Sequence, residues 1–227
     1  KYTQAIRIVQ MRKGLLRKDF YKLTNLWWIV QNYMSPRRYY MDNIYAAIDI
    51  ERQFNFKSIL YILNGSGGRF GFRNKYNAVE ELLSNIPQGW PVGLHYNYDT
   101  MLNDDRFLSQ KKQLEQTLGQ VVQSGRAHYL RFDPLRSFDQ MSKYGIRFDE
   151  SLGFPDGNGY RGGIAGIFPV YSREDGDYAA VWELPLQFWD THTDTLLKQD
   201  EFHQMIGHLS RVGGVTSLLY HPGAVYN

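Results

Sequence analysis

The sequence alternates regularly between helix-type and strand-type hydrophobic patterns from residue 41 to its end. Residues 41–54 place Ile44, Ile48 and Phe54 near one helical face, and residues 57–63 form a short apolar run that ends before a glycine-rich stretch. The alternation predicts an α/β fold of parallel strands covered by helices, either an open doubly wound sheet or a β/α barrel. Further helices are predicted at 77–86, 109–122, 137–145 and 200–214, and further strands at 91–97, 127–132, 147–154, 179–186 and 215–221.

Length and composition are those of an ordinary globular chain. With 227 residues, of which 43% are hydrophobic, the chain can bury one sizeable core. The basic excess lies mostly near the amino terminus, so we expect a basic helical segment at 1–40 followed by the α/β domain at 41–227. Within the basic segment, residues 4–18 are expected to form a helix that packs weakly, because its apolar face is narrow.

Charge and cysteine content exclude several classes of function. A net charge of +3 offers no strong basic patch, so no nucleic-acid partner is predicted. The sequence has no cysteine, which rules out disulfides, thiolate zinc sites and cysteine nucleophiles but leaves the compartment open. No apolar run approaches the roughly 20 residues that cross a bilayer, so no membrane span is expected. Because the chain begins with Lys1, we expect it to be a processed or truncated piece.

Polar residues of catalytic type lie at or just beyond the predicted strands. Parallel α/β folds assemble their sites at the carboxyl ends of strands, so side chains at these positions are expected to converge. A single histidine near a strand end is more often a structural residue than a ligand, and the prediction therefore depends on the whole set. The set consists of His95, Asp99, Arg126, His128, Asp149 and His221.

Four short motifs, in this order, resemble those of the polysaccharide deacetylase family, which is of the NodB-homology or carbohydrate esterase type, and more closely a divergent bacterial branch of it. The stretch "GLHYNYDT" at 93–100 is similar to the strand-end histidine motif, and "SGRAHYLRFD" at 124–133 is similar to the arginine motif. "IRFDESLGF" at 146–154 and "VTSLLYHP" at 215–222 resemble the two motifs that follow. The resemblance implies a deformed β/α barrel that hydrolyses an N-acetyl or O-acetyl group on a sugar with a divalent metal, usually zinc.

The resemblance also implies roles for individual residues. His95 would be the first histidine ligand of the metal, and Asp99 stands where the family has its second. His128, at the position of the motif's proline, is a candidate ligand or substrate contact, with an inward strand position as the structural alternative. Arg126 would orient a base carboxylate through a bidentate pair, and His221 would be the acid that protonates the leaving group.

Four residues are expected to contact the substrate. Tyr129 and Arg131 lie in the arginine motif, and the structural alternative for Arg131 is a salt bridge to Asp133 or Asp149. Asp149 itself belongs to the third motif and is expected at the site. Asp190 follows a predicted strand, where it could orient the acid histidine or cap a helix.

The family's first motif, which carries paired aspartates, has no counterpart in this sequence. We expect the first strand and its aspartate pair to precede Lys1, so that this chain lacks them. The leading prediction is a metal-dependent, deacetylase-like hydrolase with a carbohydrate substrate. The alternative is a catalytically silent barrel that binds a glycan or a partner chain through the same cleft. The sequence leaves open the sugar, the metal, the oligomeric state and the compartment, whether bacterial cytoplasm or cell envelope.

Overall fold

The computed structural model describes residues 36–64, 76–172, 176–189 and 197–221. The helix predicted at 4–18 lies outside these residues, and helix α3 crosses the domain boundary expected at residue 41. The α-helices are α3 (Pro36–Gln53), α4 (Tyr76–Asn85), α5 (Asp104–Leu118), α6 (Ser137–Lys143) and α7 (Leu197–Val212), and the short 3-10 turns are η2 (His128–Leu130) and η3 (Arg161–Gly163). The strands are β1 (Leu60–Ile62), β2 (Val92–Tyr96), β3 (Ser124–Ala127), β4 (Phe148–Asp149), β5 (Phe168–Tyr171), β6 (Tyr178–Glu183), β7 (Leu186–Trp189) and β8 (Ser217–Leu219).

The described strands form two sheets. The larger has the order β1-β2-β3-β4-β6-β5, and all its neighbours pair in parallel except β5 with β6. Strands β7 and β8 form a separate parallel pair. The predicted α/β class with a mainly parallel sheet is confirmed, whereas the described strands do not form one closed ring and the barrel stays a prediction. Pro185 separates β6 from β7, and its missing N–H cannot contribute to a strand ladder.

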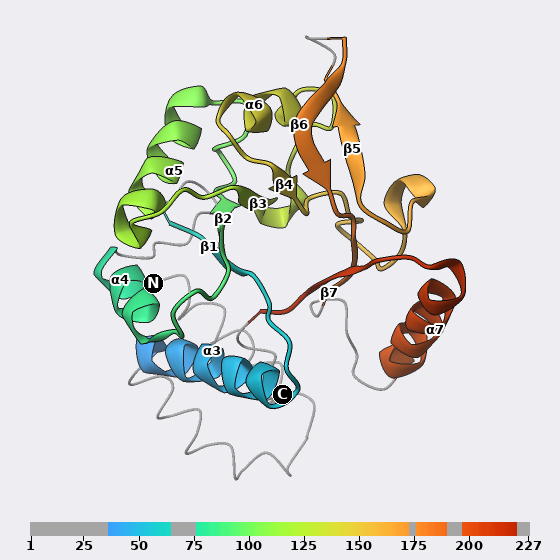
Figure 1. The fold of residues 1–227 in the computed structure, drawn as a ribbon, viewed down its shortest axis with the longest axis horizontal. Helices are drawn as coiled ribbons and strands as arrows, with labels where there is room; N and C mark the ends of the chain where they lie inside the picture. Colours follow the sequence, from blue (N-terminus) through green and yellow to red (C-terminus); the bar gives the residue numbers. More distant parts are fainter. Residues whose placement is uncertain (1–35, 65–75, 173–175, 190–196, 222–227) are drawn as a thin grey trace, which may run out of the picture.

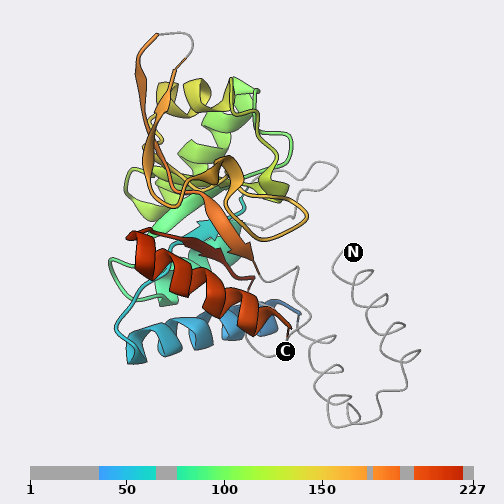
Figure 2. The ribbon, with the colours of Figure 1, turned by 90° about the vertical axis from the view of Figure 1, so that its right-hand side faces the viewer.

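The helices cover the sheet unevenly. Helices α3 to α6 surround strands β1 to β4, whereas α7 lies apart from them, beside β7 (Figure 1). Strands β5 and β6 project from the body as a hairpin in both views (Figure 1 and Figure 2). No helix in the described part of the chain combines the length and the apolar character that crossing a bilayer requires.

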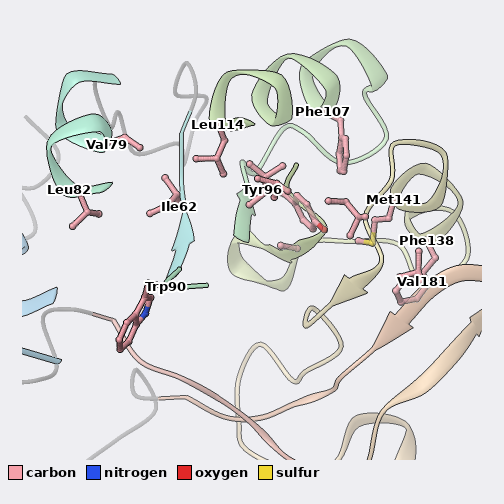
Figure 3. Packing of buried hydrophobic residues seen from close by; sticks show 14 of the residues in the cluster. Ile62, Val79, Leu82, Trp90, Tyr96, Phe107, Leu114, Phe138, Met141 and Val181 are labelled. Atoms are coloured by element: carbon pink, nitrogen blue, oxygen red, sulfur yellow. The ribbon is translucent and has the colours of Figure 1, made fainter. Parts of the chain in front are cut away.

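The main hydrophobic core lies between the larger sheet and its helices. Figure 3 shows Phe107 and Leu114 of α5 and Met141 of α6 gathered around Tyr96 of β2, and each of the four is at most 1% exposed. The Tyr96 and Phe107 rings lie 5.2 Å apart between centroids. Burial of such side chains contributes about 1.5–3 kcal/mol each. This packing fixes the position and direction of β2 and β3. It therefore also fixes the positions of the residues at the ends of these strands.

The sheet has a helix face and an inner face. Tyr96 of β2 points toward α5, so the preceding residue, His95, points to the inner face. Gly125 of β3 makes room for Tyr96, because a Cβ at Gly125 would overlap the Tyr96 hydroxyl. On the inner face, Gly93 makes room for Tyr61 of β1, since a Cβ at Gly93 would come within 2.5 Å of the Tyr61 ring. Two glycines therefore allow large side chains to cross over neighbouring strands.

Most predicted elements are present, with boundaries shifted by a few residues. The strand predicted at 127–132 is wrong, because β3 ends at Ala127 and the chain then turns with φ of 58° at Tyr129 and 51° at Leu130. The strand predicted at 147–154 is reduced to the two residues of β4. The sequence pattern does not predict strand β5, and the strand predicted at 179–186 is interrupted at Pro185, between β6 and β7.

Candidate functional site

Two histidines meet at the carboxyl ends of β2 and β3. His95 lies in register with Arg126 of the neighbouring strand, and its Nδ1 is 2.9 Å from the Arg126 carbonyl oxygen. Its Nε2 is 3.0 Å from Nδ1 of His128, which follows directly on β3. The two rings are nearly perpendicular, with centroids 4.9 Å apart. We call His95 and His128 the histidine pair.

The contacts of the histidine pair determine where its protons lie. A carbonyl oxygen only accepts hydrogen bonds, so Nδ1 of His95 is protonated and donates to Arg126. Burial, and then the nearby His128 and Arg126, lower the pKa of His95 to about 3, so its ring is neutral at neutral pH. Nε2 of His95 therefore carries a lone pair and accepts from Nδ1–H of His128. The remaining lone pair of the histidine pair then lies on Nε2 of His128.

A buried ion pair lies on the same inner face. Arg126 donates to Glu150 through a short contact, and the two side chains are 4% and 10% exposed. The Ser217 hydroxyl of β8 is 2.5 Å from Oε2 of Glu150, and the Tyr61 hydroxyl donates to Oε1 at 2.8 Å. Ser217 also accepts from Arg126 at 2.9 Å. We call Tyr61, Arg126, Glu150 and Ser217 the inner cluster.

The inner cluster connects strands that pair in different sheets. Ser217 comes from β8, whereas Arg126 and Tyr61 come from β3 and β1 of the larger sheet. The guanidinium of Arg126 also lies 4.7 Å from the centre of the Tyr61 ring, a cation–π contact. Arg126 thus holds Glu150 with its side chain and His95 with its backbone carbonyl. The histidine pair and the inner cluster are therefore one connected site.

An exposed aromatic surface adjoins the histidine pair. Tyr129 is 53% exposed and its ring lies 4.4 Å from that of His128. The guanidinium of Arg131 stacks on Tyr98 at 4.1 Å and donates to the Tyr98 carbonyl. The left-handed backbone at Tyr129 is unusual for a non-glycine residue, and such strain clusters at functional sites. Tyr129 and Arg131, both expected to contact substrate, thus lie beside His128 on one surface.

The expected metal ligands are brought together only in part. His95 and His128 meet, but the Asp99 carboxylate lies 3.5 Å from Arg131 and 3.8 Å from Arg106. Among the residues that the structure describes, no group of three or more histidine, aspartate or glutamate side chains is arranged to hold a metal ion. A catalytic zinc takes three protein ligands. The described donor set therefore does not fit a complete zinc site.

The other predicted site residues lie in different surroundings. Asp149 is fully buried on the helix face, where its carboxylate accepts from the Ser151 N–H at 2.9 Å. His221 is exposed after β8, close enough that its charge lowers the pKa of His95. Asp190 lies outside the described residues. The carboxylate that the sequence analysis did not single out is Glu150, which pairs with Arg126, and no local signal in the sequence separates it from the adjacent Asp149.

The comparisons with known proteins bear on the fold. The structure is similar to the crystal structure of a "putative polysaccharide deacetylase" from Mycobacterium smegmatis, with a TM-score of 0.55 and 15% identity. The match covers 92% of this chain and 72% of that chain. No protein-family model matches the sequence, and the comparison with curated proteins found no match. At 15% identity the likeness concerns the fold.

Proposed function

We propose that this chain is a carbohydrate deacetylase-like hydrolase that acts on N- or O-acetylated sugars at the carboxyl ends of β2 and β3. The observation that carries the proposal is the histidine pair, with ring nitrogens 3.0 Å apart beside the buried Arg126–Glu150 ion pair. The substrate class is supported by the likeness of the fold to that of the Mycobacterium smegmatis protein and by the four motifs at the strand ends.

The proposed mechanism assigns His128 the role of general base for the attacking water. His95 accepts the Nδ1–H of His128 and so keeps the lone pair of His128 on Nε2, where it can take a proton from water. The lowered pKa of His95 keeps that ring neutral and able to accept. Arg126 and Glu150 position the carbonyl that fixes His95. His221 is the proposed acid for the departing amine or alcohol.

The family resemblance suggests that the site binds a divalent ion, usually zinc. This metal remains a proposal, and no catalytic step is assigned to it. Nε2 of His95 and Nδ1 of His128 would supply two nitrogen ligands. Among the described residues, no third side chain is placed to complete the site. A metal at these two nitrogens would require the other neutral tautomer of His128, with its proton on Nε2, so uptake by the neutral pair would release no net proton. Calorimetric zinc titration measures the affinity directly. His95→Ala should weaken it, because one of the two nitrogen donors is removed.

The hydrolase proposal is tested by acetate release from a panel of N- and O-acetylated oligosaccharides, with and without zinc. His128→Ala should lower turnover by about 100-fold or more, because a general base contributes roughly that factor. His203→Ala is the matched control, since His203 is exposed on α7, away from the pair. Full activity in His128→Ala would show that His128 is not the base.

A second candidate function is a catalytically silent carbohydrate-binding protein. The observation that favours it is the incomplete donor set within the described residues, because metal-assisted hydrolysis needs a third ligand. Both candidates predict binding of an acetylated sugar at the histidine pair, and only the first predicts acetate. Binding without acetate release from any member of the panel would therefore favour the second candidate.

A further inference from the structure

Two buried carboxylic acids face each other on the helix face of the sheet. Asp149 of β4 is the register partner of Glu183 of β6, and both residues are 0% exposed. Helix α6 packs against β6 and brings Phe138 and Met141 to the core on this face. The pair thus lies in an apolar layer, where an ionised carboxylate without a cationic partner is strongly disfavoured.

Each carboxyl group has one oxygen with a donor and one without. Oδ1 of Asp149 accepts from the Ser151 N–H at 2.9 Å, and Oε1 of Glu183 accepts from the Leu152 N–H at 2.8 Å. Among the described residues no donor meets hydrogen-bond geometry at Oδ2 of Asp149 or Oε2 of Glu183. The Tyr96 hydroxyl lies beside Asp149, and burial together with the Asp149 carboxyl raises the pKa of Tyr96 well above its usual range.

Within the part of the chain that the structure describes, no positively charged side chain pairs with the two acids. Tyr96 of β2, Tyr61 of β1 and Glu150 are ionisable groups that interact with the two acids, and none of the three is a cation. Arg126 is engaged by Glu150 on the inner face, and the buried Lys111 of α5 pairs with Glu115. Two negative charges in register on adjacent strands would repel each other, and no described cation compensates them.

We propose that Asp149 and Glu183 share one proton in the folded protein, which forms a hydrogen bond between Oδ2 of Asp149 and Oε2 of Glu183. One proton supplies the missing donor for both orphaned oxygens and removes one of the two charges. Burial raises the pKa of Asp149 to about 6 and holds the pKa of Glu183 well above its usual range, which agrees with this arrangement.

The shared proton supports the strand end that carries Glu150. The N–H groups of Ser151 and Leu152 bind the two acids, and the Ser151 hydroxyl accepts from the Ala127 N–H of β3 at 2.9 Å. Loss of the proton should therefore loosen residues 150–152 and with them the Arg126–Glu150 contact. The inference is independent of the proposed reaction, because it concerns protonation and stability of the chain itself.

The sign of the pH dependence follows from the raised pKa values. In the unfolded chain both acids ionise near pH 4, whereas the folded pair keeps one proton to higher pH. The stabilisation is fully present below the unfolded pKa values and is lost as pH rises through the folded pKa of the pair. Between the unfolded pKa values and the folded pKa of the pair, this site alone should lower the folding equilibrium constant by up to tenfold per pH unit.

The experiment compares urea unfolding of the parent chain, Glu183→Gln and Asp149→Asn between pH 5 and pH 8. Either amide supplies a permanent N–H donor to the remaining carboxylate, so each variant should lose the linkage to one proton. The ratio of folding constants, parent to variant, should therefore fall with rising pH by up to tenfold per unit. Glu80→Gln, at an exposed position on α4, is the matched control and should give a constant ratio.

A measurement on the unmodified chain keeps the test valid if a variant fails to fold. Side-chain carboxyl ¹³C resonances of Asp149 and Glu183 should titrate together, with at least one step well above pH 4. Separate titrations near the ordinary values would overturn the proposal. A parent-to-variant ratio that is independent of pH for both amide variants would overturn it as well.

Discussion

Replacing Arg126 by methionine should destabilise the protein strongly, because it leaves the Glu150 carboxylate buried without its cation. The two side chains are only 4% and 10% exposed, so solvent cannot compensate the remaining charge. Breaking a buried ion pair on one side costs about 3–5 kcal/mol. Glu150→Gln should cost a similar amount, since it leaves the guanidinium of Arg126 buried with the Ser217 hydroxyl and the Tyr61 ring but without a counter-charge.

The double variant shows whether the loss of stability comes from breaking the Arg126–Glu150 ion pair. Arg126→Met with Glu150→Gln removes both charges, so its cost should be well below the sum of the single changes, with a coupling of about 2–3 kcal/mol. Urea unfolding followed by tryptophan fluorescence gives each free energy. The exposed pair Asp49–Arg52 is the control, with a 4.0 Å separation and an expected coupling below about 0.5 kcal/mol. Additive losses for Arg126 and Glu150 would refute the buried pair.

Other consequences of the structure can be measured separately. Gly125→Ala should destabilise the chain by about 1–3 kcal/mol, because its Cβ would overlap the Tyr96 hydroxyl. Gly157→Ala is the control and should be nearly neutral, because its Cβ meets open space. Equal free energies of unfolding for the two variants in urea would contradict this prediction. His95→Asn should flatten the loss of stability as pH falls from about 6.5 toward 3, because only the unfolded His95 takes up a proton there; an unchanged pH profile would remove this prediction. Tyr129→Gly should relieve the left-handed backbone and weaken sugar binding, and equal affinity of parent and variant in calorimetry would show that Tyr129 is no substrate contact.

The sequence predicted the individual helices and strands better than it predicted where the strands end and how they pair. Periodicity predicted the long helices and the central strands, because apolar spacing of 3.6 and 2 residues is a local property. It did not predict where strands stop, since the turn at Tyr129 and the break at Pro185 depend on backbone conformations within apolar runs. The pairing of β7 with β8 instead of the larger sheet is a tertiary property that no local pattern carries.

In the candidate site, too, some residues could be predicted from the sequence and others depend on tertiary packing. The two histidines could be found from their strand-end positions, because parallel register brings such positions together. The carboxylate could not be chosen from sequence, since Asp149 and Glu150 are adjacent and only packing decides which one faces the helices. Ser217 joins Arg126 across 91 residues of chain, and no motif spacing indicated that contact. Asp99 was expected to face a metal, and the arginines beside it explain its different position.

The most direct test of the central claim is a titration of the parent chain, observed through the imidazole ¹⁵N and ¹H resonances of His95 and His128, with an N-acetylated oligosaccharide. The account predicts that the acetylated sugar shifts both sets of resonances, because it binds at the histidine pair, and that the exposed His203 is unaffected. The same sugar without its acetyl groups should bind more weakly, since the acetyl carbonyl is the group that must lie next to His128. No shift at either histidine with any acetylated sugar, or shifts confined to His203, would contradict the account.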